Sequence, residues 1–346
     1  MELHKERYNV LICGTLSSGS SALHNLLKEY DNVGHFLDEF DDFRAPGLVA
    51  DQLSYNSSLS YPNKIDAVTR INSFRKRLIY KSLIWKLFLN IIPKKYFEID
   101  YNVKIVENLK NRIIRLNQVF LLKQLNKSLK SNLPFEEKIR ISRNWIQHNN
   151  NIFSTNKCFI MYDQPILKTS DIDIWTTVFN PYKLIIVYRD PRDQLADIIK
   201  RGQLYPLNGT PYMTLAGINI DSVYGKDRRG AMKFHIDAIS NRLKWIEYLE
   251  CKLNKDRILV CDFEGLVNHH EEYKTKLEDF IGVTKENHKF KNKYFDPVKS
   301  KENIGIYKNY LNDDELKYLS DLVDWYLKRT GNPKGTLKND LLKQFK

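Results

Sequence analysis

The 346-residue sequence has little cysteine and no long uninterrupted apolar run. Its four cysteines are scattered without a CxxC pair, which argues against a zinc knuckle or a disulfide framework and fits a reducing compartment. The first ten residues, MELHKERYNV, lack the apolar segment of a signal peptide. The most hydrophobic stretch, residues 78–93, is too short to span a bilayer and contains two lysines. These absences predict a cytoplasmic protein.

Acidic residues are scarce in one segment of the chain. Residues 64–157 contain 20 Lys and Arg against 6 Asp and Glu, whereas the remainder is nearly balanced, with 35 against 36. Such a segment could hold an anionic substrate, a membrane surface or nucleic acid, or it could be a solvated helical surface. Because no recognised nucleic-acid module accompanies it, we expect no nucleic-acid partner.

Apolar periodicity predicts strands that alternate with helices. The expected strands are residues 8–13, 32–37, 157–162, 182–188 and 256–263, and the expected helices include 20–30, 230–253, 271–281 and 312–329. This alternation is typical of a parallel sheet covered on both faces. We therefore predict an α/β fold with three layers: a mostly parallel central sheet flanked by helices, with a P-loop-like nucleotide cradle and a helical insertion.

Small residues follow the first strand in the stretch NVLICGTLSSGSSAL, residues 9–23. A strand, a glycine-rich turn and a helix present backbone N–H groups and a positive helix end to an anion. The spacing from Gly14 to Gly19 matches a nucleotide P-loop, but Ser20 and Ser21 follow where that loop has Lys and then Ser or Thr. ATP or GTP hydrolysis is therefore poorly supported. A tight turn without a ligand is the plainer interpretation of the same residues.

A second motif, KLIIVYRDPRDQLADI, covers residues 183–198. Arg189 follows a buried strand at its carboxyl end, which is the edge where open α/β sheets bind ligands. Guanidinium groups bind phosphate through paired hydrogen bonds, so an arginine here could hold a second phosphate of the same ligand. The alternative is a surface turn in which Asp190 and Asp193 pair with Arg189 and Arg192.

A third segment, with FEGLV at residues 263–267 before a helix that ends in FIGV, completes an order of motifs. Together the three segments resemble the bacterial-type sulfotransferases that use 3'-phosphoadenosine 5'-phosphosulfate (PAPS). The resemblance implies one domain over residues 1–346, with residues 1–42 and 157–346 as the nucleotide-binding core. Residues 43–156 would then be a basic, mainly helical insertion on the acceptor side. It also implies PAPS as the sulfuryl donor, 3',5'-adenosine bisphosphate (PAP) as the product, and no metal.

The resemblance assigns nucleotide-binding roles by position. The 5'-phosphate loop corresponds to Gly14, Ser17, Ser18, Gly19, Ser20 and Ser21, and Arg189 corresponds to the arginine of the 3'-phosphate. Asp197 stands where the family usually has a serine, and an anionic side chain is a poor phosphate ligand. A basic segment that closes over the 3' end of the nucleotide corresponds to residues 299–311, with Lys299, Lys301 and Lys308 as contacts.

The first loop departs from the family pattern at Ser17, where members usually have Lys or Arg. That cation stabilises charge on the bridging oxygen as the sulfuryl group leaves, and sulfuryl transfer depends mostly on positioning and charge stabilisation. Another cation must serve here. The candidates are Lys168, Arg201 and the lysines of residues 299–308.

The acceptor hydroxyl needs a general base, which relatives often supply as a carboxylate after the second strand. We favour Glu39 among the acidic residues there, because burial near the cradle would raise its pKa toward the working pH. His35 is the next candidate, although a lone histidine on a strand is often structural, and Asp38 is the third. Asp163 and Gln164 could orient the acceptor, or they could simply end a strand.

The acceptor itself is predicted from the region outside the nucleotide core. Residues 78–93 would form a helix with a very broad apolar face, which suits a protein core, a greasy pocket or a membrane surface. With the basic excess, this slightly favours an amphipathic lipid, sterol or glycolipid over a glycan, and peripheral contact with the inner membrane face. The rival classes are a P-loop nucleotide kinase, which would need the missing lysine and a metal-binding carboxylate, and a noncatalytic nucleic-acid binder.

Overall fold

The computed structural model describes residues 7–14, 17–36, 39–44, 48–54, 117–118, 120–129, 131, 133–153, 156–166, 172–204 and 228–331. The chain divides into two compact units. The first comprises Met1–Leu11, Asp31–Tyr182 and Leu215–Gly217, and the second comprises Ile12–Tyr30, Lys183–Thr214 and Ile218–Lys346. The boundaries between these units do not fall at residues 42 and 157. The expected single domain, with a nucleotide-binding core and an insertion, stays a prediction.

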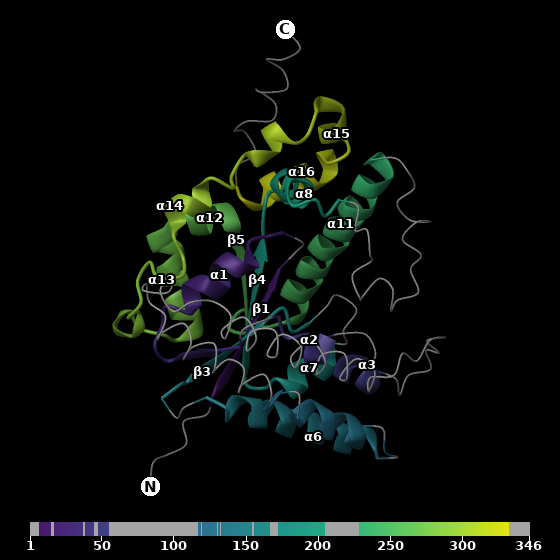
Figure 1. Ribbon diagram of the computed structural model, residues 1–346, viewed down its shortest axis with the longest axis vertical. Helices are drawn as coiled ribbons and strands as arrows, with labels where there is room; N and C mark the ends of the chain where they lie inside the picture. The colour runs from purple at the N-terminus through teal and green to yellow at the C-terminus, as the bar shows by residue number, and fades with distance from the viewer. Residues whose placement is uncertain are drawn as a thin grey trace, which may run out of the picture. The chain divides into compact units, whose positions relative to one another are not determined.

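A five-stranded parallel sheet, with helices flanking it, gives the chain the α/β fold predicted from its periodicity (Figure 1). The strand order is β2-β3-β1-β4-β5. The strands are β1 (Tyr8–Gly14), β2 (Val33–His35), β3 (Phe159–Asp163), β4 (Tyr182–Tyr188) and β5 (Ile258–Asp262). In β1 and β4 almost every residue is buried, as expected of parallel strands covered on both faces. All five predicted strands are confirmed within a few residues.

The second unit holds most of the helices that follow from the sequence pattern. They are α1 (Ser20–Leu27), α8 (Pro191–Lys200), α11 (Arg228–Lys252), α12 (Phe263–Asn268), α13 (His270–Ile281), α14 (Pro297–Lys301), α15 (Asp313–Lys317) and α16 (Ser320–Arg329). Two short 3₁₀ turns, η2 (Lys285–Asn287) and η3 (Ile306–Asn309), join them. Figure 1 shows α12, α13 and α14 on one side of β4 and β5, and α11 on the other. The carboxyl ends of β1 and β4 both lead into loops of this unit.

Local signals fix several of these helix ends. Gly282 ends α13 in the left-handed conformation, with φ of 93°. Asn312 and Glu315 form a capping box at the start of the last predicted helix. That helix is broken in two, because the N–H groups of Tyr318 and Leu319 bond three residues back, to Glu315 and Leu316. Such bonds tighten and end a turn, which sequence periodicity does not register.

A buried carboxylate anchors a loop of the second unit that has no regular structure. Glu29, just after α1, is 1% exposed and accepts hydrogen bonds from His288 Nε2 at 2.7 Å and from the N–H groups of Asn292, Tyr294 and Phe295. These four bonds fix residues 288–295, which lead directly into α14. Glu29 follows the C-terminal end of α1, the helix that begins at the small-residue loop. This helix therefore anchors the part of the chain that leads toward residues 299–308.

The first unit packs around an aromatic cluster. Phe40 stands edge-on to Tyr162 at 4.6 Å between ring centroids, and Phe36 stands edge-on to Phe153 at 4.9 Å. The helices of this unit are α2 (Asp41–Arg44), α3 (Val49–Ser54), α6 (Phe135–Asn150) and α7 (Ile172–Val178). The α6 helix lies in the segment predicted to be mainly helical, but residues 55–116 lie outside the described part of the chain.

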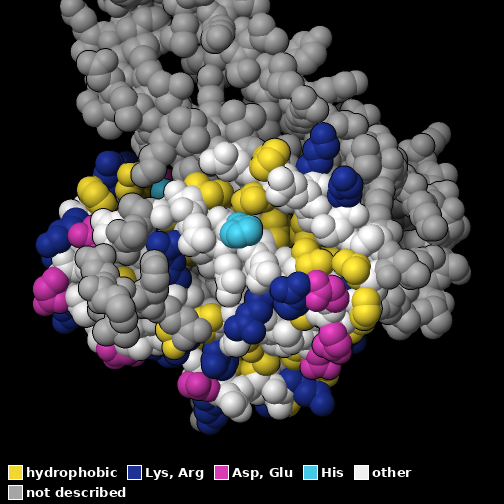
Figure 2. Space-filling view, turned by 90° about the horizontal axis from the view of Figure 1, so that it is seen from below, with side chains coloured by type: hydrophobic (Ala, Val, Ile, Leu, Met, Phe, Trp, Pro, Cys, Tyr) yellow, Lys and Arg dark blue, Asp and Glu magenta, His cyan; other side chains and the backbone are white. Residues whose placement is uncertain are grey.

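Charged side chains are mixed on the surface shown in Figure 2. Among the residues that the structure describes on this face, Lys and Arg side chains lie between acidic and hydrophobic ones. Most of the basic segment lies outside the described residues, as does the apolar stretch at residues 78–93. No helix within the described ranges is long and apolar enough to cross a membrane.

Candidate functional site

The loop after β1 is packed so tightly that its first glycine cannot carry a side chain. A Cβ atom at Gly14 would lie 2.3 Å from Ser18 Oγ and 2.9 Å from Ser20 Cβ. Ser18 is 1% exposed, and its Oγ has no hydrogen-bond partner among the residues that the structure describes. A buried hydroxyl without a partner costs free energy, so this atom is suited to a ligand. The loop thus forms a small cradle lined by polar atoms.

The α1 helix begins at this cradle with its N-terminus uncapped. Gly19 precedes the helix in the left-handed conformation, with φ of 88°, and no side chain caps the first turn. The first turn contains no acidic residue. Since the first N–H groups of a helix point outward and carry partial positive charge, this end attracts an anion. The geometry fits the phosphate loop expected from residues 14–21.

Arg189 is the second element of the candidate site, after the start of α1. It is 3% exposed and donates to the carbonyl oxygens of Ser17, at 3.1 Å, and Asn303. Its Nε atom is buried without a hydrogen-bond partner in the described residues, and no carboxylate there lies within ion-pair distance of it. Asp193 interacts with Arg189 electrostatically but forms no ion pair with it. Because burying a cation without a direct ion pair is costly, Arg189 has an environment suited to binding an anion.

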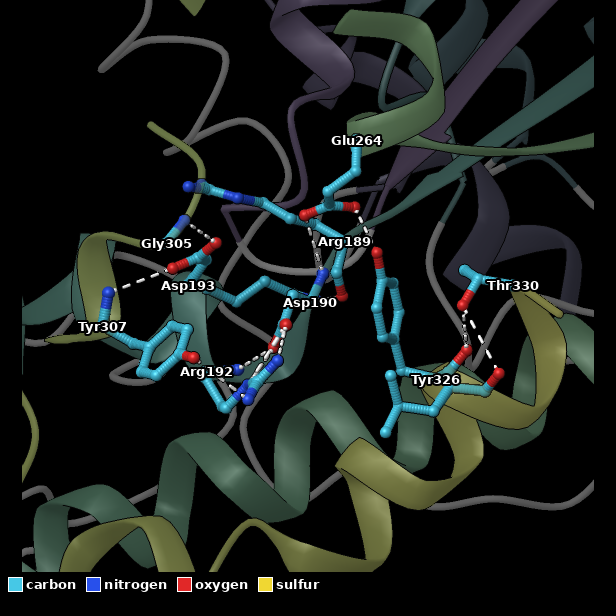
Figure 3. A network of polar contacts seen from close by, with 11 residues as sticks. Arg189, Asp190, Arg192, Asp193, Glu264, Gly305, Tyr307, Tyr326 and Thr330 are labelled. Atoms are coloured by element: carbon cyan, nitrogen blue, oxygen red, sulfur yellow. Dashed lines mark hydrogen bonds and ion pairs between the residues drawn. The ribbon is translucent and has the colours of Figure 1, made fainter. Parts of the chain in front are cut away.

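The neighbouring arginine has a different environment. Asp190 forms a buried ion pair with Arg192, with Oδ2 at 2.5 Å from NH2, and also caps α8 by accepting from the N–H of Arg192 (Figure 3). Burial opposes the charge on Arg192, but the Asp190 carboxylate outweighs it and raises the pKa of Arg192. The surface-turn alternative is right that Asp190 pairs with Arg192, but it is wrong that the pair lies at the surface, because both residues are buried.

Asp193 fixes the segment that approaches Arg189 from the C-terminal part of the chain. Its carboxylate accepts the N–H of Gly305 at 2.7 Å and the N–H of Tyr307 at 3.0 Å, as Figure 3 shows. Arg192 also lies over the ring of Tyr307, with 4.3 Å from Cζ to the centroid. Burial raises the pKa of Asp193, and the two backbone donors oppose that rise. The basic segment predicted to close over a nucleotide is thus held next to Arg189.

Phe263 connects the cradle to Arg189. A Cβ atom at Gly19 would lie 2.3 Å from Cδ2 of this ring, so the loop rests directly against it. The guanidinium of Arg189 lies over the same ring, at 5.0 Å from the centroid. One aromatic side chain of the FEGLV motif therefore supports both of the candidate anion sites.

Glu264, the next residue, is a half-buried carboxylate beside them. It accepts the N–H of Asp190 at 3.1 Å and the hydroxyl of Tyr326 at 2.8 Å (Figure 3). Burial, reinforced by the negative charge of Asp190, raises its pKa to about 7, while the Tyr326 hydrogen bond works against this rise. Because the unfolded chain ionises this group at lower pH than the folded protein does, the contribution of Glu264 to stability is greatest in acid and is lost as the pH rises toward 7.

The other residues predicted to contact the nucleotide differ in their exposure and in their ion-pair partners. Lys299, Lys301 and Lys308 are exposed on the segment that Asp193 holds, and Lys299 is 3.9 Å from the Asp296 carboxylate. Asp197 is buried and forms an ion pair with Arg201 at 2.8 Å. Arg201, one of the candidate replacement cations, is therefore already engaged.

The candidate bases belong to the first unit. Glu39 is 55% exposed and pairs with Arg44, so the burial expected for its carboxylate is not found. His35 is half-buried at the end of β2. Asp38 and Lys168 lie outside the described residues. Asp163 ends β3, and its carbonyl accepts the N–H of Phe40, while Gln164 follows with φ of 51°.

One arginine at the cradle has no signal in the sequence. Arg242 lies on α11, and its Nε donates to the carbonyl of Gly14 at 3.1 Å. It is one of many charged residues on a 25-residue helix, and nothing in its local sequence distinguishes it. In the part of the chain that the structure describes, no group of three or more His, Cys, Asp or Glu residues could hold a metal ion.

Comparisons with known proteins give weak likenesses. No protein-family model matches the chain. No curated protein sequence matches it either. Among solved structures, the sulfotransferase domain of the Synechococcus PCC 7002 olefin synthase matches with a TM-score of 0.43 and 14% identity, covering 90% of this chain and 97% of that one. The sulfotransferase domain of the curacin biosynthetic pathway matches with 0.43 and 12%, covering 92% and 97%. The sulfotransferase STF9 of Mycobacterium avium matches with 0.42 and 10%, covering 94% and 77%.

Proposed function

We propose that the chain is a sulfotransferase that moves a sulfuryl group from PAPS to a hydroxyl of its acceptor. The observation that carries this proposal is a pair of anion sites on one ring. The start of α1, which has no side-chain cap, and the buried Arg189 both contact Phe263, and Arg189 forms no ion pair among the described residues. A nucleotide with phosphates on both its 5' and its 3' oxygens would satisfy both sites at once.

The residues present fit that nucleotide. The cradle offers backbone donors and the unpartnered hydroxyl of Ser18 to the 5'-phosphate. Arg189 offers guanidinium donors to the 3'-phosphate, beside the segment that contains Asn303 and Gly305. The loop contains no lysine, which disfavours ATP or GTP as the bound nucleotide.

PAPS, when bound, would supply an activated sulfuryl group on its 5'-phosphate. The chain's own residues hold and orient the nucleotide through the cradle and Arg189, and they provide a base that takes the proton of the acceptor hydroxyl. Glu39 stays the favoured base and His35 the second, with Asp38 third. The exposure and the partners of Glu39 and His35 do not favour one of these two residues over the other as the base.

We further propose an amphipathic acceptor, such as a glycolipid or sterol, with a glycan hydroxyl as the alternative. This rests on the apolar sequence of residues 78–93, which predicts a helix with a broad apolar face, and on the basic excess in residues 64–157. The same features favour peripheral contact with a membrane. Sedimentation with anionic phospholipid vesicles should therefore retain the protein at low salt and release it at high salt. Equal recovery in the supernatant at all salt concentrations would contradict membrane contact.

The experiment that tests the donor is a thermal-shift titration with PAP, set beside AMP and beside ATP with magnesium. Selective stabilisation by PAP is expected, by about 2.7 kcal/mol when the ligand is at 100 times its Kd. AMP carries only the 5'-phosphate and should shift the melting temperature much less. A shift with magnesium ATP and none with PAP would make the cradle a site for another nucleotide and overturn the proposal.

The base is tested separately from the donor site. Replacing Glu39 with glutamine should reduce turnover by about 100-fold or more without weakening PAP binding. Turnover near the wild-type rate would transfer the role to His35, for which the corresponding change is His35→Ala.

A further inference from the structure

We propose that Arg242 supplies the positive charge that the cradle itself lacks, and so acts as a catalytic residue of sulfuryl transfer. This inference rests on the proposed function. The loop from Gly14 to Ser21 contains no Lys or Arg. Any group transfer in which negative charge grows on the oxygen of a leaving phosphate is accelerated by a cation placed at that oxygen. The cradle therefore needs a cation from elsewhere in the chain.

The structure brings one there from α11. Arg242 donates from Nε to the carbonyl oxygen of Gly14 at 3.1 Å, which places its guanidinium at the first residue of the cradle. The side chain is half-buried, and its Cζ lies 4.5 Å from the centroid of the Trp245 ring. The ring and the carbonyl hold the planar guanidinium from two directions. A charge held in this way needs little reorganisation when the reaction develops negative charge.

The other cations are less suited to this role. Arg201 is engaged with Asp197, and Lys299, Lys301 and Lys308 are exposed. Arg189 contacts the loop at another residue, through the carbonyl of Ser17, and also donates to the carbonyl of Asn303. Two guanidinium groups thus contact the cradle at different residues. We assign Arg189 to the 3'-phosphate and Arg242 to the 5' end, where sulfur is transferred.

The chemical step balances without any further reagent. The acceptor oxygen forms a new bond to sulfur, and its proton passes to the base. The bond between sulfur and the bridging oxygen breaks, and its electron pair stays on that oxygen, which becomes part of the 5'-phosphate of PAP. The guanidinium of Arg242 offsets the charge that this oxygen gains, and the sulfate ester leaves with the acceptor.

The test compares Arg242→Gln with Lys244→Ala, an exposed charge on the same helix. Glutamine keeps a donor for the Gly14 carbonyl but removes the charge. We expect turnover to fall by about 100- to 1,000-fold in Arg242→Gln. By calorimetry, affinity for PAP should fall by about 10-fold or more and affinity for PAPS should fall less, because the bridging oxygen carries its full negative charge only after the sulfuryl group has left. Lys244→Ala should leave both turnover and affinities unchanged.

Charge replacement makes the test sharper. Adding Ser17→Lys to the Arg242→Gln variant returns a cation to the loop and should recover much of the lost turnover. The backbone tolerates this change in principle, because Ser17 already adopts a positive φ of 51° as a residue with a side chain. Arg242→Lys, which keeps the charge, should lie between the wild type and Arg242→Gln, and it serves if the glutamine variant does not fold.

The outcomes separate this inference from the proposed function. If the wild type binds PAPS and PAP but Arg242→Gln keeps both its turnover and its PAP affinity, the assignment of Arg242 is overturned and the proposed function stands. If Arg242→Gln loses PAP and PAPS affinity equally and Ser17→Lys restores nothing, Arg242 only shapes the loop. If the wild type binds neither nucleotide, both the inference and the proposed function fail.

Discussion

Replacing Arg189 with methionine should strongly weaken the binding of PAP while leaving the fold almost as stable as before. In the ligand-free protein this side chain is a buried cation that has no carboxylate partner among the described residues. Burying such a charge costs several kcal/mol. Its hydrogen bonds to the carbonyls of Ser17 and Asn303 return about 1.5–3 kcal/mol each. Because these terms nearly cancel, the free energy of unfolding should change by less than about 2 kcal/mol.

Binding should respond far more strongly than folding. Removing one member of a buried charge pair costs about 2–5 kcal/mol, which weakens PAP affinity by about 30-fold to several thousand-fold. Calorimetric titration with PAP measures the affinity, and urea denaturation measures the free energy of unfolding. AMP, which has no 3'-phosphate, should bind the variant and the wild type with similar affinity.

Arg192→Met is the matched control, because it removes the same side chain two residues away. Its loss leaves the Asp190 carboxylate buried without its cation, which should cost about 3–5 kcal/mol of stability. Arg189→Met should therefore lose mainly PAP affinity, whereas Arg192→Met should lose mainly stability. Unchanged PAP affinity in Arg189→Met, or equal destabilisation of both variants, would refute the assignment of Arg189 to a phosphate.

Three further changes probe the frame of the site. Gly19→Ala should reduce both PAP affinity and melting temperature, because its Cβ would overlap Phe263; Gly202→Ala, also at positive φ but with nothing within 4 Å, should cost only about 1–2 kcal/mol in denaturation. Wild-type stability relative to Glu264→Gln should fall by about 1.4 kcal/mol per unit as the pH rises from 5 toward 7 and then level off; parallel urea curves across this range would contradict the raised pKa. Glu29→Ala should destabilise the fold by about 3–5 kcal/mol, since several buried N–H donors lose their acceptor, and an unchanged urea midpoint would contradict that anchoring role.

The sequence was sufficient to predict the strands and the glycine-rich loop, because both depend on neighbouring residues. Residues 8–13 and 182–188 are continuous apolar runs, and each proved to be a buried strand. The loop at Gly14 could be predicted because its small residues are adjacent in the chain. Arg189 could be placed at the sheet edge because it directly follows a strand.

Contacts between distant residues could not be predicted in the same way. Asp190 lies next to one arginine and two residues from another, and only the folded geometry shows that it pairs with Arg192. Arg242 is 228 residues from the carbonyl that it binds. Glu39 was expected to be buried because it follows a strand, but a nearby arginine and an open surface determine its environment instead. Such pairings depend on tertiary packing, which periodicity and spacing do not encode.

Phe263 links the two candidate anion sites through one rigid aromatic ring. Its ring lies against Gly19 and also under the guanidinium of Arg189, so one side chain contacts both sites. Under the proposed function, this ring sets the distance between the two phosphates. Adenosine 2',5'-bisphosphate, with the same charge and a different span, should be rejected by this ring rather than by any missing hydrogen bond. Selectivity for the nucleotide would then depend on the rigidity of the Phe263 ring, which does not change with salt concentration or with pH.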